Sequence, residues 1–505
     1  MKKLIALVLA LVMLCALFAA CGSKTNTPSD KPDNTDNPGT NETPGTNDDP
    51  GQKEEIVIRD FGGADYTVLY NSLPETNPGI YEFKGDLGSD SVRYAVAERN
   101  YEVEKQFGVK LNLIPKVGGW GERKDFTSAV RAEKMGGGTD GYDLIATHSV
   151  YLGWMCIEGL GKDLANYPDY IDFSQPWWSQ NIYDELNVNG HLFMMAGDIA
   201  HSLYSYINVM FVNETQFENY FSDQGGVDTL YDLVDAGEWT WEKLWEYADA
   251  FGSGANGDGK FGIRTNTHAW RASFVSQDAH LFYRDSDNRL TLNNALGKKE
   301  VDIIAQMTEH YAKDNNEFVE DYGGTHAGEY NPEFIAGNIL FYPQTLGEAQ
   351  ALFSKATDDF GIVPLPKYNA DQEMYKTQCR DTVTAVMIMC TTKDEDKAAI
   401  VTEGMAYYGN KIVVPAYYEQ SLVTRYVDKY TDILDTIRAG LTYQPGDAYL
   451  QSSGGDLPSM RWDMFVRTVK DGTIAASTKY EGNLAAGKNE LKTFYNKLAK
   501  LGITY

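Results

Sequence analysis

The order of predicted strands and helices between positions 66 and 146 limits the fold of this chain most strongly. Residues 66–70, 109–114 and 142–146 have the composition of buried strands, and residues 91–107 and about 125–135 have the periodicity of amphipathic helices. A strand-helix-strand-helix-strand order predicts a parallel sheet covered by helices, and hence an α/β fold.

The segment at residues 189–213 contains two apolar runs, at 192–196 and 207–212, on either side of a break at Gly197 and Asp198. This pattern predicts two strands joined by a short turn. We interpret the segment as the passage of the chain from one α/β lobe to another, because a hinge needs only a few residues to change backbone direction and Gly197 is permissive. An ordinary hairpin within one sheet fits the local pattern equally well.

The length of 505 residues is too great for one ordinary core and predicts two domains or lobes. Hydrophobic residues make up 43% and charged residues 23% of the chain, values typical of a globular protein. The formal charge of −28 argues against a nucleic-acid partner, whose phosphates require stripes of Lys and Arg. It equally disfavours a basic membrane-binding face, but it does not bear on a neutral ligand.

Residues 1–20 have the features of a secretion signal, with two lysines, an apolar stretch and small residues before Cys21. The sequence LFAAC at residues 17–21 resembles the bacterial lipoprotein box, although Phe18 stands where an aliphatic residue is usual. The resemblance implies a lipoprotein signal peptide, after whose removal Cys21 becomes a lipidated N-terminus. The alternative is a plain secreted protein that is cut nearby and keeps Cys21 as a spare thiol.

Residues 21–55 comprise the lipidated Cys21 and a predicted disordered tether. From residue 23 onward this segment contains no aromatic or aliphatic residue, and it repeats the sequence PGTN. Such a segment cannot bury a core and is typical of a solvated spacer. As a flexible coil it would span roughly 30 Å, enough to hold a domain clear of a membrane surface.

Further elements are predicted along the rest of the chain. The strands lie at residues 338–341, 360–363 and 383–389, and the helices lie at about 238–250, 397–408 and 489–501. Residues 254–260 fit the spacing of a phosphate loop, but Phe261 stands where Ser or Thr would bind Mg²⁺. The same segment fails the register of a Ca²⁺-binding EF-hand loop, so we predict a surface turn at residues 256–259.

Seven short sequences follow the tether in order: YDLIAT (142–147), DFSQPWW (172–178), NGHLFMMAGD (189–198), VMFVN (209–213), GEWTWEKL (237–244), AGNILFY (336–342) and DDFGIVPLPKY (358–368). Their order and spacing resemble the extracellular solute-binding proteins, family 1, of ABC importers. The resemblance covers most of the chain after the tether.

This resemblance implies a two-lobed type II periplasmic-binding-protein fold with a ligand cleft between lobes that close around the ligand. Lobe 1 would comprise residues 56–197 plus about 383–445, and lobe 2 would comprise about 198–382 plus 446–505. The implied function is an extracytoplasmic receptor, lipid-anchored to the outer face of the cell membrane. It would capture a carbohydrate, often an oligosaccharide, for permease subunits that work with a separate ATPase. We expect a monomer.

Motifs of catalysis do not occur in the sequence, which contains neither G-x-S-x-G nor H-E-x-x-H. The seven histidines show no metal-ligand spacing, so we predict no metal and no cofactor. A carboxylate pair could serve a glycosidase, but among 72 acidic residues such a pair arises easily by chance. A carbohydrate receptor is therefore expected rather than an enzyme. The alternatives are a receptor for another solute such as a peptide, or a surface polysaccharide-degrading enzyme or glycan adhesin.

A sugar-binding site needs aromatic faces that stack on pyranose rings and planar polar groups that bond hydroxyls. Ligands of open α/β sheets bind beyond the carboxyl ends of the strands, which favours the loops at residues 118–121 and 147–149. The candidate ligand-binding residues are Trp120 and His148 on the first lobe, Asp198 near the crossing, and Trp270, Tyr342 and Trp462 in predicted loops or strand ends. For each of them the alternative is a packing role.

Overall fold

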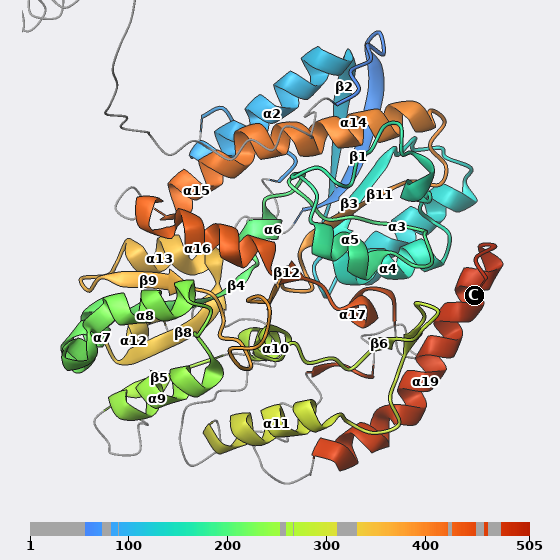
Figure 1. The fold of residues 1–505 in the computed structure, drawn as a ribbon. Helices are drawn as coiled ribbons and strands as arrows, with labels where there is room; N and C mark the ends of the chain where they lie inside the picture. Colours follow the sequence, from blue (N-terminus) through green and yellow to red (C-terminus); the bar gives the residue numbers. More distant parts are fainter. Residues whose placement is uncertain are drawn as a thin grey trace, which may run out of the picture. The chain divides into compact units, whose positions relative to one another are not determined.

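A computed structural model describes residues 56–72, 82–88, 90–252, 259–265, 267–310, 331–422, 427–450, 459–462 and 476–504 (Figure 1). The signal segment and tether predicted at residues 1–55 lie outside the described residues, and so does most of the turn predicted at 256–259. No helix in the described part of the chain is both long enough and apolar enough to cross a membrane.

The first sheet has the strand order β11-β3-β1-β2. Its strands are β1 (Ala64–Asn71), β2 (Val109–Lys116), β3 (Leu144–His148) and β11 (Thr384–Ile388). β1 pairs in parallel with β2 and β3, which confirms the predicted parallel sheet, whereas the late strand β11 joins β3 in the antiparallel sense. The accompanying helices are α2 (Ser91–Phe107), α3 (Arg123–Met135), α4 (Ser149–Ile157), α5 (Gln180–Leu186) and α14 (Glu395–Tyr408) (Figure 1). We call this sheet and these helices the first lobe.

Helix α2 has the bounds that its sequence predicts. The side chain of Asp90 accepts a hydrogen bond from the backbone N–H of Arg93 and caps the first turn. Gly108 ends the helix with a left-handed conformation, at φ 55°. The apolar stripe of Val92, Val96, Val103 and Phe107 is buried, so local sequence and tertiary packing specify the same element.

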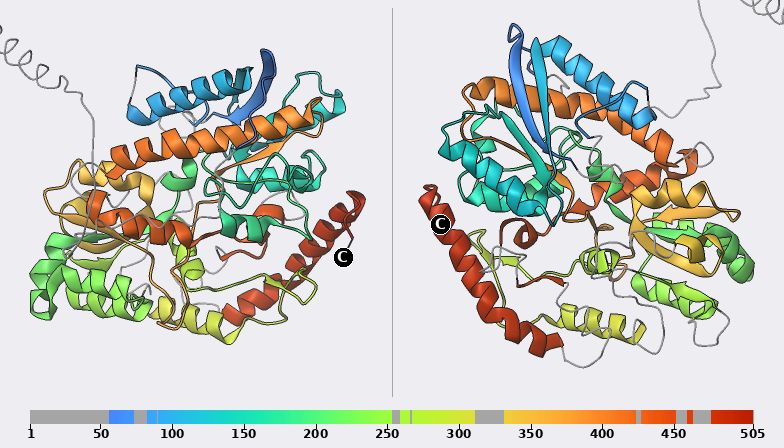
Figure 2. Two further views of the ribbon diagram at one scale, coloured as in Figure 1. Left: turned by 45° about the horizontal axis from the view of Figure 1, so that its top comes forward. Right: turned by 180° about the vertical axis from the view of Figure 1, so that it is seen from behind.

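The second sheet has the order β5-β8-β4-β9. Its strands are β4 (Asn208–Asn213), β5 (Phe261–Ile263), β8 (Ile339–Thr345) and β9 (Phe360–Val363). β4 is antiparallel to both β8 and β9, and β5 is parallel to β8. Its helices include α7 (Glu214–Phe221), α8 (Gly226–Asp235), α9 (Trp241–Phe251), α10 (Thr267–Ser276), α12 (Asn331–Ile335) and α13 (Ala349–Phe353) (Figures 1 and 2). We call this group the second lobe.

Helix α9 begins three residues later than its predicted start at residue 238. Thr240 caps it by accepting a hydrogen bond from the backbone N–H of Lys243. Trp239 and Trp241, on either side of this cap, are fully buried in the core.

The segment at residues 189–213 runs from the first sheet to the second. It begins with the predicted turn, where Asn189 and Gly190 have positive φ values of 53° and 81°. Met195 then bridges Val386 of β11, and the chain continues through α6 (Ser202–Ser205) into β4. The two apolar runs therefore pair with different sheets, which excludes the hairpin. The first run makes only isolated bridges and is not a regular strand.

The remaining elements lie between the sheets or along one side of them. They are β6 (Tyr283–Arg284), β7 (Leu290–Thr291), α11 (Lys298–His310), β10 (Thr377–Gln378), α15 (Val414–Leu422), α16 (Val427–Ala439), β12 (Leu441–Thr442), α17 (Pro445–Tyr449) and α19 (Ala476–Lys500). β10 and β12 form a short parallel pair at the crossing between the lobes.

Helix α19 begins well before its predicted start at residue 489, and it contacts α4 of the first lobe as well as α11 and β7 (Figure 2). Near its first turns, the hydroxyl of Tyr480 donates to the backbone carbonyl of Asn293 at 3.0 Å. After its C-terminal end, the backbone carbonyl of Thr504 accepts from the side chain of Asn189 at 3.0 Å. The helix thus spans from the α11 side to the first lobe.

Candidate functional site

A first aromatic group lies at the carboxyl end of β3, where ligands of open α/β sheets bind. It consists of Trp120, His148 and Tyr151. The ring of Tyr151 lies 6.0 Å from that of Trp120 and 5.0 Å from that of His148, measured between centroids. Trp120 keeps 43% of its surface exposed, and the guanidinium of Arg123 stacks on it at 4.1 Å. The structure thus brings two of the predicted site residues together through a third aromatic residue.

His148 is buried within this group and uncharged at neutral pH. Burial, assisted by the positive charge of Arg380, lowers the pKa of His148 to about 3. Its Nδ1 lies 2.7 Å from the hydroxyl of Tyr151. The side chain can therefore exchange hydrogen bonds with a neutral hydroxyl without bringing a charge into the site.

A second aromatic group consists of Trp270, Phe274 and Trp462. Phe274 contacts the ring of Trp270 edge-on at 4.5 Å and stacks on that of Trp462 at 4.2 Å. Trp270 lies in α10, not in a loop or at a strand end as predicted. Trp270 and Trp462 expose 0% and 2% of their surfaces, so in this structure both are packing residues of the second lobe.

A buried ion cluster lies between the two aromatic groups. The Oδ2 atom of Asp381 accepts from Arg271 at 3.3 Å and from Arg461 at 2.8 Å. Arg271 follows Trp270 in sequence, and Arg461 precedes Trp462. The backbone carbonyl of Asp381 accepts from the hydroxyl of Ser149, the neighbour of His148, at 3.1 Å. The cluster therefore connects the second aromatic group to the strand end that carries the first.

Asp198 occupies a different place, at the crossing between the lobes. Its carboxylate accepts hydrogen bonds from Tyr204, from Asn410 at 2.7 Å and from Arg438 at 3.1 Å. Burial raises the pKa of Asp198, and these three donors oppose that shift. The carboxylate thus ties α6 and α16 to the crossing and contacts neither aromatic group.

Tyr342 belongs to the second sheet. It is within β8 rather than at a strand end, and it is fully buried. Its ring packs 5.4 Å from that of Phe334, and its hydroxyl accepts from the side chain of Gln344 at 3.3 Å.

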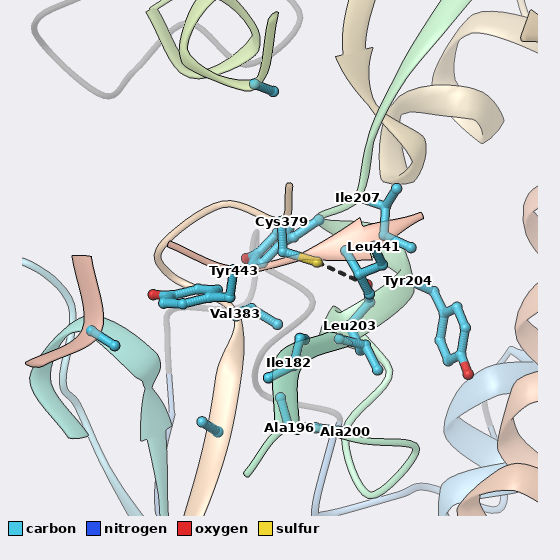
Figure 3. Packing of buried hydrophobic residues seen from close by; sticks show 14 of the residues in the cluster. Ile182, Ala196, Ala200, Leu203, Tyr204, Ile207, Cys379, Val383, Leu441 and Tyr443 are labelled. Atoms are coloured by element: carbon cyan, nitrogen blue, oxygen red, sulfur yellow. Dashed lines mark hydrogen bonds between the residues drawn. The ribbon is translucent and has the colours of Figure 1, made fainter. Parts of the chain in front are cut away.

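Apolar packing joins the two chain segments that cross between the lobes. Figure 3 shows Cys379 and Val383 of one crossing beside Leu203 and Ile207 of the other. The thiol of Cys379 donates to the backbone carbonyl of Leu203 at 3.2 Å, and burial raises the pKa of this thiol. Both crossings are thus held by one continuous core.

Comparison with solved structures identifies the architecture. No protein-family model matches the sequence, and no curated protein matches it significantly. Among solved structures, a cyclo/maltodextrin-binding protein complexed with maltotetraose is similar with a TM-score of 0.55 and 15% identity. The similarity covers 87% of this chain and 98% of that chain.

Two further structures are similar over comparable lengths. The galacto-N-biose-/lacto-N-biose I-binding protein of an ABC transporter from Bifidobacterium longum gives a TM-score of 0.54 at 13% identity, covering 86% of this chain and 98% of that one. The GacH receptor of Streptomyces glaucescens gives 0.51 at 11% identity, covering 85% and 99%. The chain has the two-lobed periplasmic-binding-protein fold.

Within the periplasmic-binding-protein fold of this chain, sequence reasoning missed Tyr151, Phe274 and the ion cluster. Tyr151 could have been found, because it lies three residues after His148 and so shares its side of the first turn of α4. The pairing of Asp381 with Arg461 has no such local signal, since the two residues are 80 positions apart.

Proposed function

We propose that this protein is the extracytoplasmic substrate-binding component of an ABC importer and that its ligand is a carbohydrate. The two-lobed fold supports the receptor role. The similar structures are of proteins solved in complex with maltotetraose, lacto-N-biose and acarbose. Because these proteins are at most 15% identical to this chain, the choice of ligand rests on the site itself.

The observation that carries the proposal is the first aromatic group, with its exposed Trp120, beside a buried ion cluster. Sugars present apolar C–H faces, which stack on aromatic rings, and pairs of hydroxyls, which bind planar carboxylates and guanidinium groups. Trp120 supplies an exposed ring, and neutral His148 supplies a hydrogen-bonding edge. Arg271, Asp381 and Arg461 hold planar charged groups, but these are buried and paired with one another and would reach a ligand only if the lobes separate.

The remaining predicted residues would take part only if the lobes separate. Trp270, Tyr342 and Trp462 are buried in this structure, and the carboxylate of Asp198 is occupied by protein donors. Contact of these four residues with ligand stays a prediction for an opened arrangement. A ligand that touches both lobes binds the closed form better and shifts the population toward closure.

A thermal-shift screen across mono- and oligosaccharides, followed by calorimetry of the hits, tests the ligand class. We expect one-to-one binding without turnover. Selective binding of peptides would show that the ligand is another solute and not a carbohydrate. Release of reducing ends from glycans would indicate an enzyme. Small-angle scattering should then show a smaller radius of gyration at saturation, and an unchanged radius would contradict closure.

The proposed location is the outer face of the cell membrane, with lipidated Cys21 as the anchor. The Cys21→Ser variant should lose palmitate labelling and be shed or remain unprocessed. Persistent labelling of that variant would rule out Cys21 as the lipid anchor. As a monomeric receptor, the chain would act with membrane permease subunits and a separate ATPase. Measurable ATP hydrolysis by the isolated chain would contradict that division of labour.

A further inference from the structure

An open cavity of about 640 Å³ lies between the two lobes, away from the candidate functional site. On one side it is lined by Asn181, Asp184 and Glu185 of α5 in the first lobe. On the other side it is lined by the end of α10, the start of α11 and residues 368–376. Neither aromatic group and no member of the ion cluster lines it.

Carboxylates outnumber amines on the walls of this cavity. Five acidic residues face two lysines, and one of the five, Asp278, already binds both lysines. The carboxylate of Asp278 lies 2.6 Å from the amine of Lys376 and 3.5 Å from that of Lys299. The other four carboxylates belong to Asp184, Glu185, Asp371 and Glu373. Within the described ranges, none of them makes a side-chain hydrogen bond or an ion pair.

Glu185 is the most informative of these four acids. Its side chain is half-buried, and burial raises its pKa. The nearby guanidinium of Arg284 donates to the backbone carbonyls of Asp184 and Glu185, at 3.4 and 2.9 Å, and not to the Glu185 carboxylate. The charges of Arg284, His280 and Lys376 oppose this rise in the pKa of Glu185. The carboxylate has no side-chain hydrogen-bond partner among the described residues, and a cation in the cavity would further stabilise its charged form.

The lining also indicates the size and shape of the cation. In the described part of the chain, no three His, Cys, Asp or Glu side chains are grouped to hold a metal ion. The unpaired acids instead lie on two separate segments, α5 and residues 368–376, around a cavity much larger than one ion. Tyr368, whose ring lies 5.2 Å from the amine of Lys299, and the exposed Met374 add apolar surface to the same lining. A lining that combines carboxylates with apolar surface matches a chain of amino groups joined by methylenes.

We propose that this cavity binds an organic polycation of the polyamine class, with amino groups on the carboxylates of both lobes. The methylene segments would lie over Tyr368 and Met374. The site is independent of the proposed sugar site, since the two share no residue.

Calorimetric titration of the purified chain with spermidine at about 0.15 M salt tests the proposal, because this ionic strength screens general attraction to an acidic protein. We expect saturable one-to-one binding, with Mg²⁺ failing to compete at equal concentration. The double variant Glu185→Gln/Glu373→Gln should bind about tenfold more weakly, since partly exposed ion pairs contribute less than about 1 kcal/mol each.

The matched control is Glu481→Gln, which removes one exposed acid on α19, outside the cavity. It should bind spermidine like the wild type. No saturable binding, or equal weakening in the double variant and the control, would overturn the proposal. Unfolding curves of both variants should match that of the wild type, and because the titration uses no sugar, its outcome does not depend on the proposed function.

Discussion

The two aromatic groups of this protein have similar compositions and opposite surroundings. The first exposes much of Trp120 at the end of a parallel strand, whereas the second encloses Trp270 and Trp462 around Phe274. Aromatic residues in a sequence therefore do not reveal whether a ring faces ligand or core. The difference arises from the supporting element, because Trp120 lies between strand and helix while Trp270 lies within a helix.

Replacement of Trp270 by Ala should have the largest effect and should fall on stability. Removing a fully buried tryptophan leaves a cavity beside Phe274, which we expect to cost about 3 to 5 kcal/mol of unfolding free energy. Urea denaturation of Trp270→Ala and Trp120→Ala measures the contrast. Equal and small losses in the two variants would contradict the distinction between the groups.

Breaking the ion cluster should have the next largest effect. The Asp381→Asn variant leaves Arg271 and Arg461 buried without their shared negative charge, which we expect to cost about 3 kcal/mol. The control is Asp302→Asn, which removes an ion pair with the largely exposed Lys298 and should change stability by less than about 0.5 kcal/mol. Indistinguishable urea midpoints for the two variants would show that the ion cluster does not stabilise the junction between the lobes.

The fold was predictable where the determining signals are local. The cap at Asp90, the stripe of α2 and the stop at Gly108 lie within one segment, so the helix has its predicted bounds. Strand β11 was predicted as a strand, but its antiparallel partner β3 lies more than 200 residues earlier and cannot be read from its own residues.

The candidate site was predictable only on the first lobe, where the strand-end rule applies to Trp120 and His148. On the second lobe, Trp270 was predicted in a loop or at a strand end, but it lies within α10. Asp198 was expected near the crossing and lies there, but its partners Asn410 and Arg438 come from distant segments that no local pattern indicates.

A further pair of tryptophans contacts a buried carboxylate, which makes stability depend on pH. The indole N–H groups of Trp177 and Trp178 donate to the two carboxylate oxygens of Glu403, at 2.9 and 2.8 Å. Burial nevertheless raises the pKa of Glu403 from 4.5 to about 7. The folded protein therefore binds this proton more tightly than the unfolded chain. The resulting stability is fully present below pH 4.5 and is lost as the pH rises through 7.

The loss should amount to about 2 to 3 kcal/mol between pH 4.5 and 8, and it should be absent in Glu403→Gln. His148 has a lowered pKa and acts in the opposite direction, with stability rising from pH 3 toward 6.5. The measurement is therefore the difference in unfolding free energy between wild type and Glu403→Gln at several pH values. A difference in unfolding free energy that stays constant between pH 4.5 and 8 would refute the raised pKa of Glu403.

The smallest expected effect belongs to Trp120→Ala and should fall on binding rather than on stability. The exposed ring contributes little to the core, so unfolding should change by less than about 1 kcal/mol. Loss of one stacked sugar face should weaken binding by about 1 to 2 kcal/mol, which is roughly 5- to 30-fold in Kd. Tyr220→Ala removes a similarly exposed ring, 46% accessible, from α7 of the second lobe and serves as the control. Calorimetry with a sugar from the screen should show weaker binding by Trp120→Ala than by Tyr220→Ala. Wild-type affinity in Trp120→Ala would show that the first aromatic group does not contact the sugar.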